Sequence, residues 1–166
     1  YLHPAALRAS ARALRLAAAC NPGVALPVRR IVPMDPSDTL QIDEIAQLHL
    51  ELLRSSDGGK KGSLLSVIDA TRTAQGARLL RRWLLAPFYD VAAIRRRQDA
   101  VEALVGEAIE RAHLREALAS VGDIERLAER AVLGEATPRD LGVLRDSLAE
   151  VPRAVQAVTS IVESSA

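Results

Sequence analysis

The sequence predicts an all-α chain, apart from one short segment, and three observations support this fold class. The apolar residues are dominated by Ala, Leu and Val, whereas aromatic residues make up only 2% of the 166 residues. Ala and Leu favour helices, while strands favour aromatic and β-branched residues. Apolar residues also recur at helical spacing between residues that cap helices. Hydrophobic (49%) and charged (26%) residues occur at globular frequencies, and we expect roughly 70% helix against a typical third.

Residues 1–38 are expected to form a helix and a linker. Helical spacing covers residues 5–20, Pro4 suits the first turn, and residues 21–23 (Asn-Pro-Gly) end the helix. Residues 28–34 contain β-branched residues and are closed by prolines, so the one short β segment is expected there.

Residues 39–166 are expected to form a second, incomplete helical domain that opens with a helix and a loop. The helix is predicted over residues 40–53, with Asp43 and Glu44 at its positive N-terminal end. The polar, Gly-rich residues 54–62 follow, and this loop is the expected point of disorder. The apolar face of the helix is expected to consist of Ile42, Ile45, Leu48 and Leu52.

Four polar residues predict where the next helices begin, because a side-chain oxygen there accepts a hydrogen bond from a first-turn N–H. The expected caps and helices are Ser63 for 64–68, Thr73 for 74–85, Asp90 for a helix from residue 91, and Asp123 for 124–133. A further helix is predicted over residues 109–121. The helix after Asp90 is expected to bury a stripe of Val91, Ile94, Val101, Leu104 and Val105.

The last helix is predicted to begin at Thr137, because Pro138 suits its first position and Asp140 can bond back to the cap. Pro152 removes an internal hydrogen bond, so a kink or brief break is expected. Apolar residues alternate at spacings of three and four, which is typical of a seam against a partner helix. We expect this seam to pack on later helices of the same domain, or to drive self-association where it is open. The seam comprises Leu141, Leu144, Leu148, Val151, Val155, Val158 and Val162.

Charge and cysteine content limit the possible classes of function. The net charge of +1 excludes a strong global field toward nucleic acid or membrane. Cys20 stands alone, which is typical of a reducing compartment. No apolar run approaches the ~20 residues of a membrane span, and the first residues lack the basic region of a signal peptide. We therefore expect a cytoplasmic piece without a membrane partner, and the missing initiator Met indicates a fragment.

No catalytic, cofactor-binding or metal site is predicted. Lys60-Lys61-Gly62-Ser63 resembles a phosphate-binding loop only superficially, because Gly62, and not a lysine, stands directly before Ser63, the hydroxyl residue that would hold Mg²⁺. A flexible loop that leads into a serine cap is the preferred interpretation. His3, His49 and His113 lack the spacing of metal ligands. No local signature supports a nucleophile, although catalytic triads can assemble from distant residues.

Basic residues concentrate between Lys60 and Arg97, and two interpretations are open. A functional face would bind phosphates or an acidic partner surface. A solvated face would instead pair with carboxylates one turn away, as Arg95 can with Asp99. The scarcity of aromatic residues for stacking favours the solvated face. If the face is functional, its residues are expected to be Arg78, Arg81, Arg82, Arg95 and Arg96.

The stretch from Gly62 to Val101 is the most distinctive part of the sequence. Its motifs and those downstream closely resemble the start of the core, or lever, domain of the MutS family of DNA mismatch-repair proteins. The resemblance covers about residues 40–152, with His49 standing where the family usually has Asn. The motifs are Gly62-Ser63-Leu64-Leu65, Asp69-x-Thr71-x-Thr73-x-x-Gly76, Arg81-Arg82-Trp83-Leu84, Gly122-Asp123-Ile124-Glu125-Arg126 and Pro138-Arg139-Asp140-Leu141.

Several of these signature residues have an expected structural role. Asp69, Thr71 and Thr73 suit caps between helices. Gly76 is expected to allow a close helix–helix approach, because Gly in a helix costs about 1 kcal/mol relative to Ala. Trp83 is expected to supply the largest buried area. The signature comprises Gly62, Ser63, Asp69, Thr71, Gly76, Trp83, Asp123, Arg126, Arg139 and Asp140.

The resemblance implies a structural role within a larger DNA-binding ATPase. Family members are dimers that bind mismatched DNA and switch with ATP and Mg²⁺, and their ATPase and clamp domains lie C-terminal of this segment. Their mismatch reader is a Phe-x-Glu motif in an N-terminal domain, so Phe88-Tyr89-Asp90 is not that motif. Residues 1–38 would lead from the connector domain into the core.

This segment would be a non-catalytic lever that couples the ATPase to the DNA-binding parts, in a bacterial cytoplasm at the nucleoid. The alternative is a stand-alone helical module that binds nucleic acid or protein through the basic face within residues 60–97.

Overall fold

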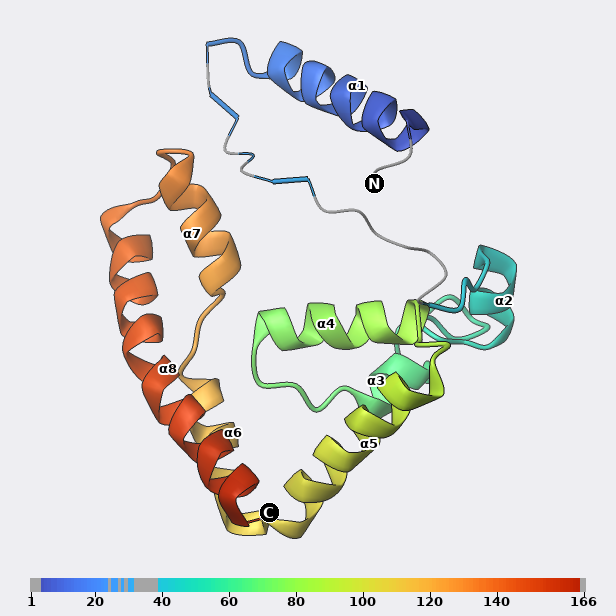
Figure 1. Ribbon diagram of the computed structural model, residues 1–166, viewed down its shortest axis with the longest axis vertical. Coiled ribbons are helices and arrows are strands. Elements are labelled where there is room, and N and C mark those ends of the chain that lie inside the picture. The colour runs from blue at the N-terminus through green and yellow to red at the C-terminus, as the bar shows by residue number, and fades with distance from the viewer. Residues whose placement is uncertain (1–3, 24, 27, 29, 32–38, 165–166) are drawn as a thin grey trace. The chain divides into compact units, whose positions relative to one another are not determined.

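The computed structural model describes residues 4–23, 25, 26, 28, 30, 31 and 39–164, and these are mostly helical (Figure 1). The chain divides into two compact units, Tyr1–Asp35 and Pro36–Ala166. The predicted helical fold class is confirmed. Within the described residues, β pairing is limited to an isolated antiparallel bridge between Thr39 and Phe88.

The described part of the first unit contains one helix, α1 (Pro4–Cys20), which ends where it was predicted to end. The Asn21 side chain donates a hydrogen bond to the Ala17 carbonyl at 2.9 Å, and Gly23 follows with a φ of 82°. The predicted β segment at 28–34 falls largely outside the described residues. At positions 28, 30 and 31, which are described, there is no strand.

The second unit opens with α2 (Glu44–His49), which is shorter than the helix predicted over residues 40–53. Its start agrees with the prediction, because the Asp43 carboxylate accepts a hydrogen bond from a first-turn N–H at 2.7 Å. The helix ends early because the backbone turns at Glu51, which adopts a φ of 49°.

The segment after α2 pairs with the start of α3 (Leu64–Ile68). The carbonyls of Glu51 and Leu52 accept hydrogen bonds from the N–H groups of Leu64 and Leu65, both at 2.9 Å. Leu52 is buried by this arrangement, with a relative exposure of 6%. Helical periodicity could not indicate this pairing, since it joins residues far apart in the sequence.

The loop at residues 54–62, which was predicted to be disordered, is closed on itself by hydrogen bonds. The Ser55 N–H donates to the Gly59 carbonyl at 2.9 Å, and the Gly58 N–H donates to the Ser55 carbonyl at 2.8 Å. Ser55 is buried, and Gly58 and Gly62 take positive φ angles of 79° and 92°. Glycine adopts this left-handed conformation without steric penalty, so the glycines that suggested disorder allow a tight turn.

Helices α4 (Ala74–Leu85) and α5 (Val91–Gly106) begin at the predicted caps, Thr73 and Asp90. The stripe predicted to be buried on α5 is wrong for most of its members. Val91, Val101 and Val105 are 60%, 58% and 66% exposed, Ile94 is also exposed, and only Leu104 is half-buried. The partly buried positions are instead Ala93, Arg97, Ala103 and Leu104.

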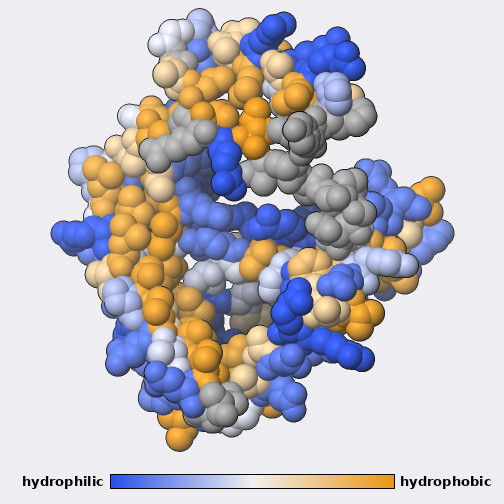
Figure 2. All heavy atoms as spheres, in the orientation of Figure 1, coloured by the Kyte–Doolittle hydropathy of each residue, from blue (hydrophilic) through white to orange (hydrophobic). Residues whose placement is uncertain are grey.

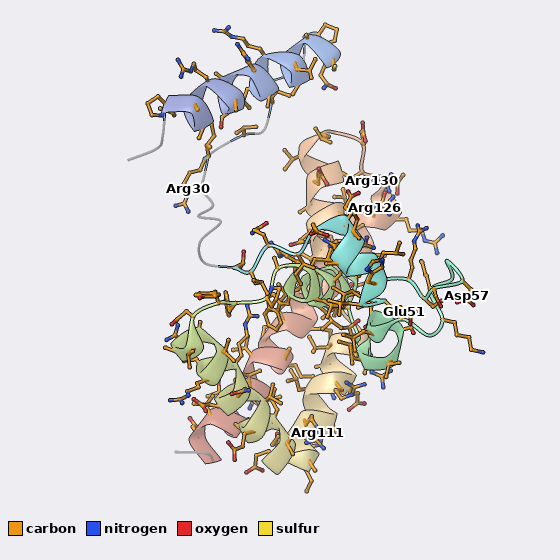
Figure 3. All side chains as sticks on the ribbon, turned by 90° about the vertical axis from the view of Figure 1, so that its right-hand side faces the viewer. Arg30, Glu51, Asp57, Arg111, Arg126 and Arg130 are labelled. Carbon is orange, nitrogen blue, oxygen red and sulfur yellow. The ribbon has the colours of Figure 1, made fainter. Side chains whose placement is uncertain are left out.

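The end of α5 is capped by a side chain from the next helix, α6 (Ala108–Ala119). The Arg111 guanidinium, labelled in Figure 3, donates to the carbonyls of Leu104 and Val105. A cation at this position also interacts favourably with the negative end of the helix dipole.

Of the remaining helices, α7 (Ile124–Val132) and α8 (Pro138–Ser164), α8 packs with both α6 and α7. α6 and α8 lie side by side, and α7 packs against the first half of α8 (Figure 1). Ala117 on α6 is fully buried and, being small, allows the helices to approach closely. α8 continues through Pro152 without the predicted break.

The apolar seam predicted on α8 is largely exposed, so its expected packing is not formed within the described residues. Leu148, Val155 and Val162 are 52%, 57% and 62% exposed, and Figure 2 shows apolar side chains gathered along α8 on the viewed face. The buried side chains of α8 belong to a neighbouring face, which consists of Ser147, Ala157 and Ile161.

None of the helices in the described part of the chain combines the length and apolar character needed to cross a membrane.

Candidate functional site

The five arginines predicted to form a basic face lie on α4 and α5 and differ in their partners. Arg78 is held in an ion pair with two carboxylates. Among the ion pairs of the described residues, none involves Arg81, Arg82, Arg95 or Arg96, and all four are exposed. These four cations are therefore available to a ligand, whereas Arg78 has a structural role.

Arg78 joins α4 to the start of α7. Its guanidinium donates to both carboxylate oxygens of Asp123, at 2.8 and 2.7 Å, and to Glu125 at 2.6 Å. Bidentate pairs of this kind are among the stronger hydrogen bonds in proteins. The hydrogen bonds from Arg78 hold the pKa of Asp123 below its ordinary value, and those to Asp123 and Glu125 raise the pKa of Arg78. Asp123 also caps α7 by accepting from the Arg126 N–H at 3.3 Å.

Gly122, next to this pair, connects three parts of the second unit. Its carbonyl accepts a hydrogen bond from the Gln75 side chain on α4 at 3.1 Å, and its N–H donates to the Ser147 hydroxyl on α8 at 2.9 Å. A Cβ at this position would lie 3.1 Å from both the Ser147 Oγ and the Val143 Cγ1. The absence of a side chain therefore permits α8 to approach the turn between α6 and α7.

The signature residues before α4 form a compact capping arrangement. Asp69 accepts hydrogen bonds from the Thr71 N–H at 3.1 Å and the Thr71 hydroxyl at 2.6 Å, and these bonds hold its pKa below the ordinary value. Thr73 caps α4 by accepting from the Gly76 N–H at 3.0 Å. A Cβ on Gly76 would meet the side chains of Thr71 and Thr73. The close approach at Gly76 thus involves its own capping segment, and not another helix as expected.

The start of α8 carries the predicted capping interaction together with an ion pair from α7. Asp140 accepts hydrogen bonds from the Thr137 N–H and hydroxyl, at 2.8 and 2.7 Å, which lower its pKa. Arg130, labelled with Arg126 in Figure 3, pairs with Asp140 at 3.2 Å. A cavity of about 410 Å³ lies beside this ion pair, and Arg126, Arg139, Asp123 and Asp140 are among the residues that line it. The signature residues at this end of the molecule therefore cluster, but acidic groups already balance much of their positive charge.

Arg97 and Trp83 form a contact that the sequence analysis did not anticipate. The Arg97 guanidinium carbon lies 3.7 Å from the ring centroid of Trp83 and 3.7 Å from that of Phe88. Partial burial lowers the pKa of Arg97. Trp83 is 40% exposed and is therefore not among the buried side chains of the core. No spacing rule links these residues, which come from α4, the connection after it, and α5.

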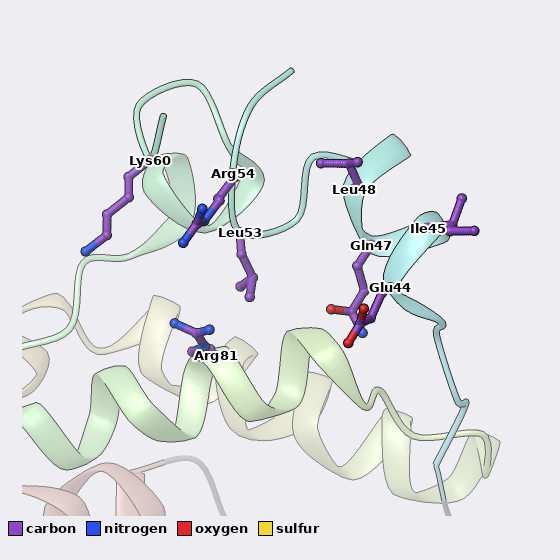
Figure 4. Close-up of a pocket in the computed structure, with 8 residues that line it drawn as sticks. All are labelled: Glu44, Ile45, Gln47, Leu48, Leu53, Arg54, Lys60 and Arg81. Atoms are coloured by element: carbon purple, nitrogen blue, oxygen red, sulfur yellow. The ribbon is translucent and has the colours of Figure 1, made fainter. Parts of the chain in front are cut away.

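A pocket between α2, the 54–62 loop and α4 brings together cations from distant parts of the sequence (Figure 4). Its volume is about 710 Å³, and its lining includes Arg54, Lys60 and Arg81. Of these, Arg81 was predicted as a residue of the face and Lys60 as the start of the basic stretch, whereas Arg54 was not predicted, because it approaches them through the folding of the loop. We call these three residues the cationic cluster.

The loop before α3 does not fit the ATP and Mg²⁺ that the resemblance implies for a full-length protein. The Ser63 hydroxyl donates to the Lys60 carbonyl at 2.7 Å, caps α3 by accepting from the Ser66 N–H at 3.2 Å, and is 1% exposed. This hydroxyl is therefore buried and engaged in capping, and it is not placed to hold a metal ion. Within the described residues, no group of three His, Cys, Asp or Glu side chains is arranged to hold a metal.

Comparison with protein families and with curated relatives gives consistent matches. Residues 46–165 match the family model described as MutS domain III. The chain is 61% identical over 160 residues to the DNA mismatch repair protein MutS of Sorangium cellulosum, an alignment that covers 96% of the chain and 17% of that protein.

More distant relatives carry the same description. The MutS protein of Roseiflexus castenholzii is 43% identical over 157 residues, which cover 93% of the chain and 14% of that protein. MutS 1 of Halobacterium salinarum is 41% identical over 157 residues, which cover 95% of the chain and 18% of that protein. The chain thus spans less than a fifth of the length of these relatives.

Proposed function

We propose that this chain, which belongs to the MutS family of DNA mismatch-repair proteins, acts as a structural lever within a longer protein. In this role it couples an ATPase domain to the parts that bind mismatched DNA. Supporting this proposal is the Gly122 junction, where hydrogen bonds tie α4 and α8 to the same turn. Elements connected in this way can move together, which is what mechanical coupling between distant sites requires.

The other properties of the full-length protein follow from family membership as parts of the same proposal. It would bind ATP and Mg²⁺ in a domain outside this segment, contact DNA through other domains, and act as a homodimer in the bacterial cytoplasm at the nucleoid. Residues 1–38 would be the connector-to-core helix and linker, and residues 39–166 an incomplete core domain. The segment itself would be non-catalytic.

The lever role is tested by loosening the Gly122 junction in the full-length protein. Ser147→Ala removes the hydroxyl that binds the Gly122 N–H, far from any expected nucleotide site. We expect basal ATP hydrolysis to persist, while the stimulation of hydrolysis by mismatched DNA falls by about fivefold or more, the lower end of typical allosteric coupling.

Ser160→Ala is the matched control for this variant, because Ser160 bonds only the carbonyl one turn before it on the same helix. Thermal melting checks that both variants are folded. The lever proposal is wrong if mismatched DNA stimulates ATP hydrolysis by the folded Ser147→Ala and Ser160→Ala variants equally well. A second measurement uses the chain alone, for which we expect no ATP turnover; Mg²⁺-dependent hydrolysis by the pure chain would contradict the proposal.

A direct nucleic-acid contact is a second candidate function, favoured by the exposed cations Arg81, Arg82, Arg95 and Arg96. Phosphate contacts release counterions, so the affinity for duplex DNA should fall steeply between two salt concentrations in a mobility-shift titration. The double variant Arg81→Glu with Arg82→Glu should abolish such binding. If DNA affinity is unchanged in this variant, the basic face is not the site.

A further inference from the structure

The cationic cluster combines three positive charges that form no ion pair with a carboxylate of the described residues. Arg54, Lys60 and Arg81 come from three separate segments, and none takes part in an ion pair within the described residues. Figure 4 shows these three side chains at one end of the pocket and Glu44 at the other end, and Leu53 lies on the side of the cations that faces Glu44. Like charges gathered in this way favour an anionic ligand, because its binding relieves their mutual repulsion.

The α2 side of the same pocket carries exposed apolar side chains beside the polar Glu44 and Gln47. Ile45 and Leu48 line it and are 68% and 55% exposed, although both lie in a folded helix. An interface between proteins typically combines exposed apolar side chains of this kind with arginines. A phosphate group of DNA would satisfy the cations but would leave Ile45 and Leu48 in water.

We propose that this pocket is the docking site for an acidic, amphipathic helical segment of a protein. Carboxylates on one face of the segment would pair with Arg54, Lys60 and Arg81, and leucine-type side chains beside them would cover Ile45 and Leu48. Glu44 at the opposite end disfavours a segment with acidic groups along its whole length. The pocket does not overlap the Gly122 junction, so this inference is independent of the lever role.

The experiment measures the affinity of the protein for synthetic helical peptides by fluorescence anisotropy. The probe peptide presents glutamates on one face with leucines beside them, and the comparison peptide has glutamine in place of every glutamate. We expect the glutamate peptide to bind at least about tenfold more tightly than the glutamine peptide, with an advantage that falls as salt increases. Hydrogen exchange should show protection at residues 44–62.

Two charge reversals on α4 localise the binding. Arg81→Glu is expected to weaken the affinity for the glutamate peptide by about tenfold or more. Arg82 is the neighbouring arginine, is also exposed and lies outside the pocket, so Arg82→Glu should change the affinity for this peptide less than about twofold. Circular dichroism checks that both variants keep their helices.

Three outcomes would overturn the proposal. They are failure of the glutamate peptide to bind, equal binding of the two peptides, or equal losses in Arg81→Glu and Arg82→Glu. Duplex DNA serves as the competing ligand: if it binds more tightly than the peptide and loses affinity in Arg81→Glu, the pocket recognises phosphate and not a protein.

Discussion

The two parts of the second unit are held together by different interactions. Helices α6, α7 and α8 pack through buried side chains, among them Ala117, Ala157 and Ile161. In residues 39–106, the segment after α2, the 54–62 loop and the start of α3 are connected through backbone hydrogen bonds and hydroxyl groups, as at Leu52 and Ser63. The first arrangement depends on shape and apolar contact, the second on a few directional bonds. Substitutions should therefore act differently in the two parts.

The largest effect is expected from a cavity in the helical part. Ile161→Ala removes a side chain that is only 3% exposed, and such truncations cost about 2–5 kcal/mol. Its neighbour Val162 is 62% exposed, so Val162→Ala should change stability by less than about 0.5 kcal/mol. Urea denaturation followed by circular dichroism gives both free energies of unfolding. Similar losses in the two variants would mean that the buried face of α8 has been misassigned.

A smaller loss is expected at the Gly122 junction, which also accepts a hydrogen bond from Gln75 of the other part. Ser147→Ala removes a buried hydroxyl and leaves the N–H of the half-buried Gly122 without its acceptor, so we expect a cost near the lower end of the about 1–3 kcal/mol of an unsatisfied buried donor. Ser147 and Ser160 both donate to the carbonyl one turn before them, so Ser160→Ala controls for that shared bond. If both variants unfold at the same urea concentration, the contact with Gly122 contributes nothing to stability.

The next effect concerns a buried hydroxyl in the hydrogen-bonded part. Ser63→Ala removes the cap of α3 and is expected to cost about 0.5–2 kcal/mol. Ser66→Ala, at an exposed position in the same helix, should cost less. Hydrogen exchange at residues 63–68 checks the location of the change. A uniform loss of protection over α6 to α8 would show that the two parts do not differ as described.

The smallest expected effect is a pH dependence at the Arg78–Asp123 pair. The pKa of Asp123 is lower in the folded chain than its ordinary value of about 3.9. Its stabilising contribution is therefore complete above that value and is lost as the pH falls through the lower, folded-state pKa. In Arg78→Leu the Asp123 pKa should rise toward its ordinary value. A carboxyl chemical-shift titration measures this, and an unchanged titration curve would argue against the pair.

Local features of the fold could be predicted from the sequence, whereas the choice of buried face could not. The caps at Ser63, Thr73, Asp90 and Asp123 were correct because a capping bond involves residues only a few positions apart. The buried stripe on α5 was wrong because apolar residues occur on more than one side of that helix. Its neighbours then decide which side is covered.

The candidate site shows the same division. The basic run that includes Arg81 was visible in the sequence, but its gathering with Arg54 and Lys60 depends on how the 54–62 loop folds. The partners of Arg78 lie 45 and 47 positions away, and no local pattern indicates such a pair. Gly122 was noted only as part of a motif, although its hydrogen bonds reach both α4 and α8.

The stack of Arg97 on Trp83 also has an optical consequence. Trp83 is the single tryptophan of the sequence, so its near-ultraviolet emission reports on one place, the connection between α4 and α5. The indole ring emits differently when a guanidinium lies on it than when water contacts it. Any motion that separates α5 from α4 would change the fluorescence without an attached dye, which makes the chain its own sensor for bending at this connection.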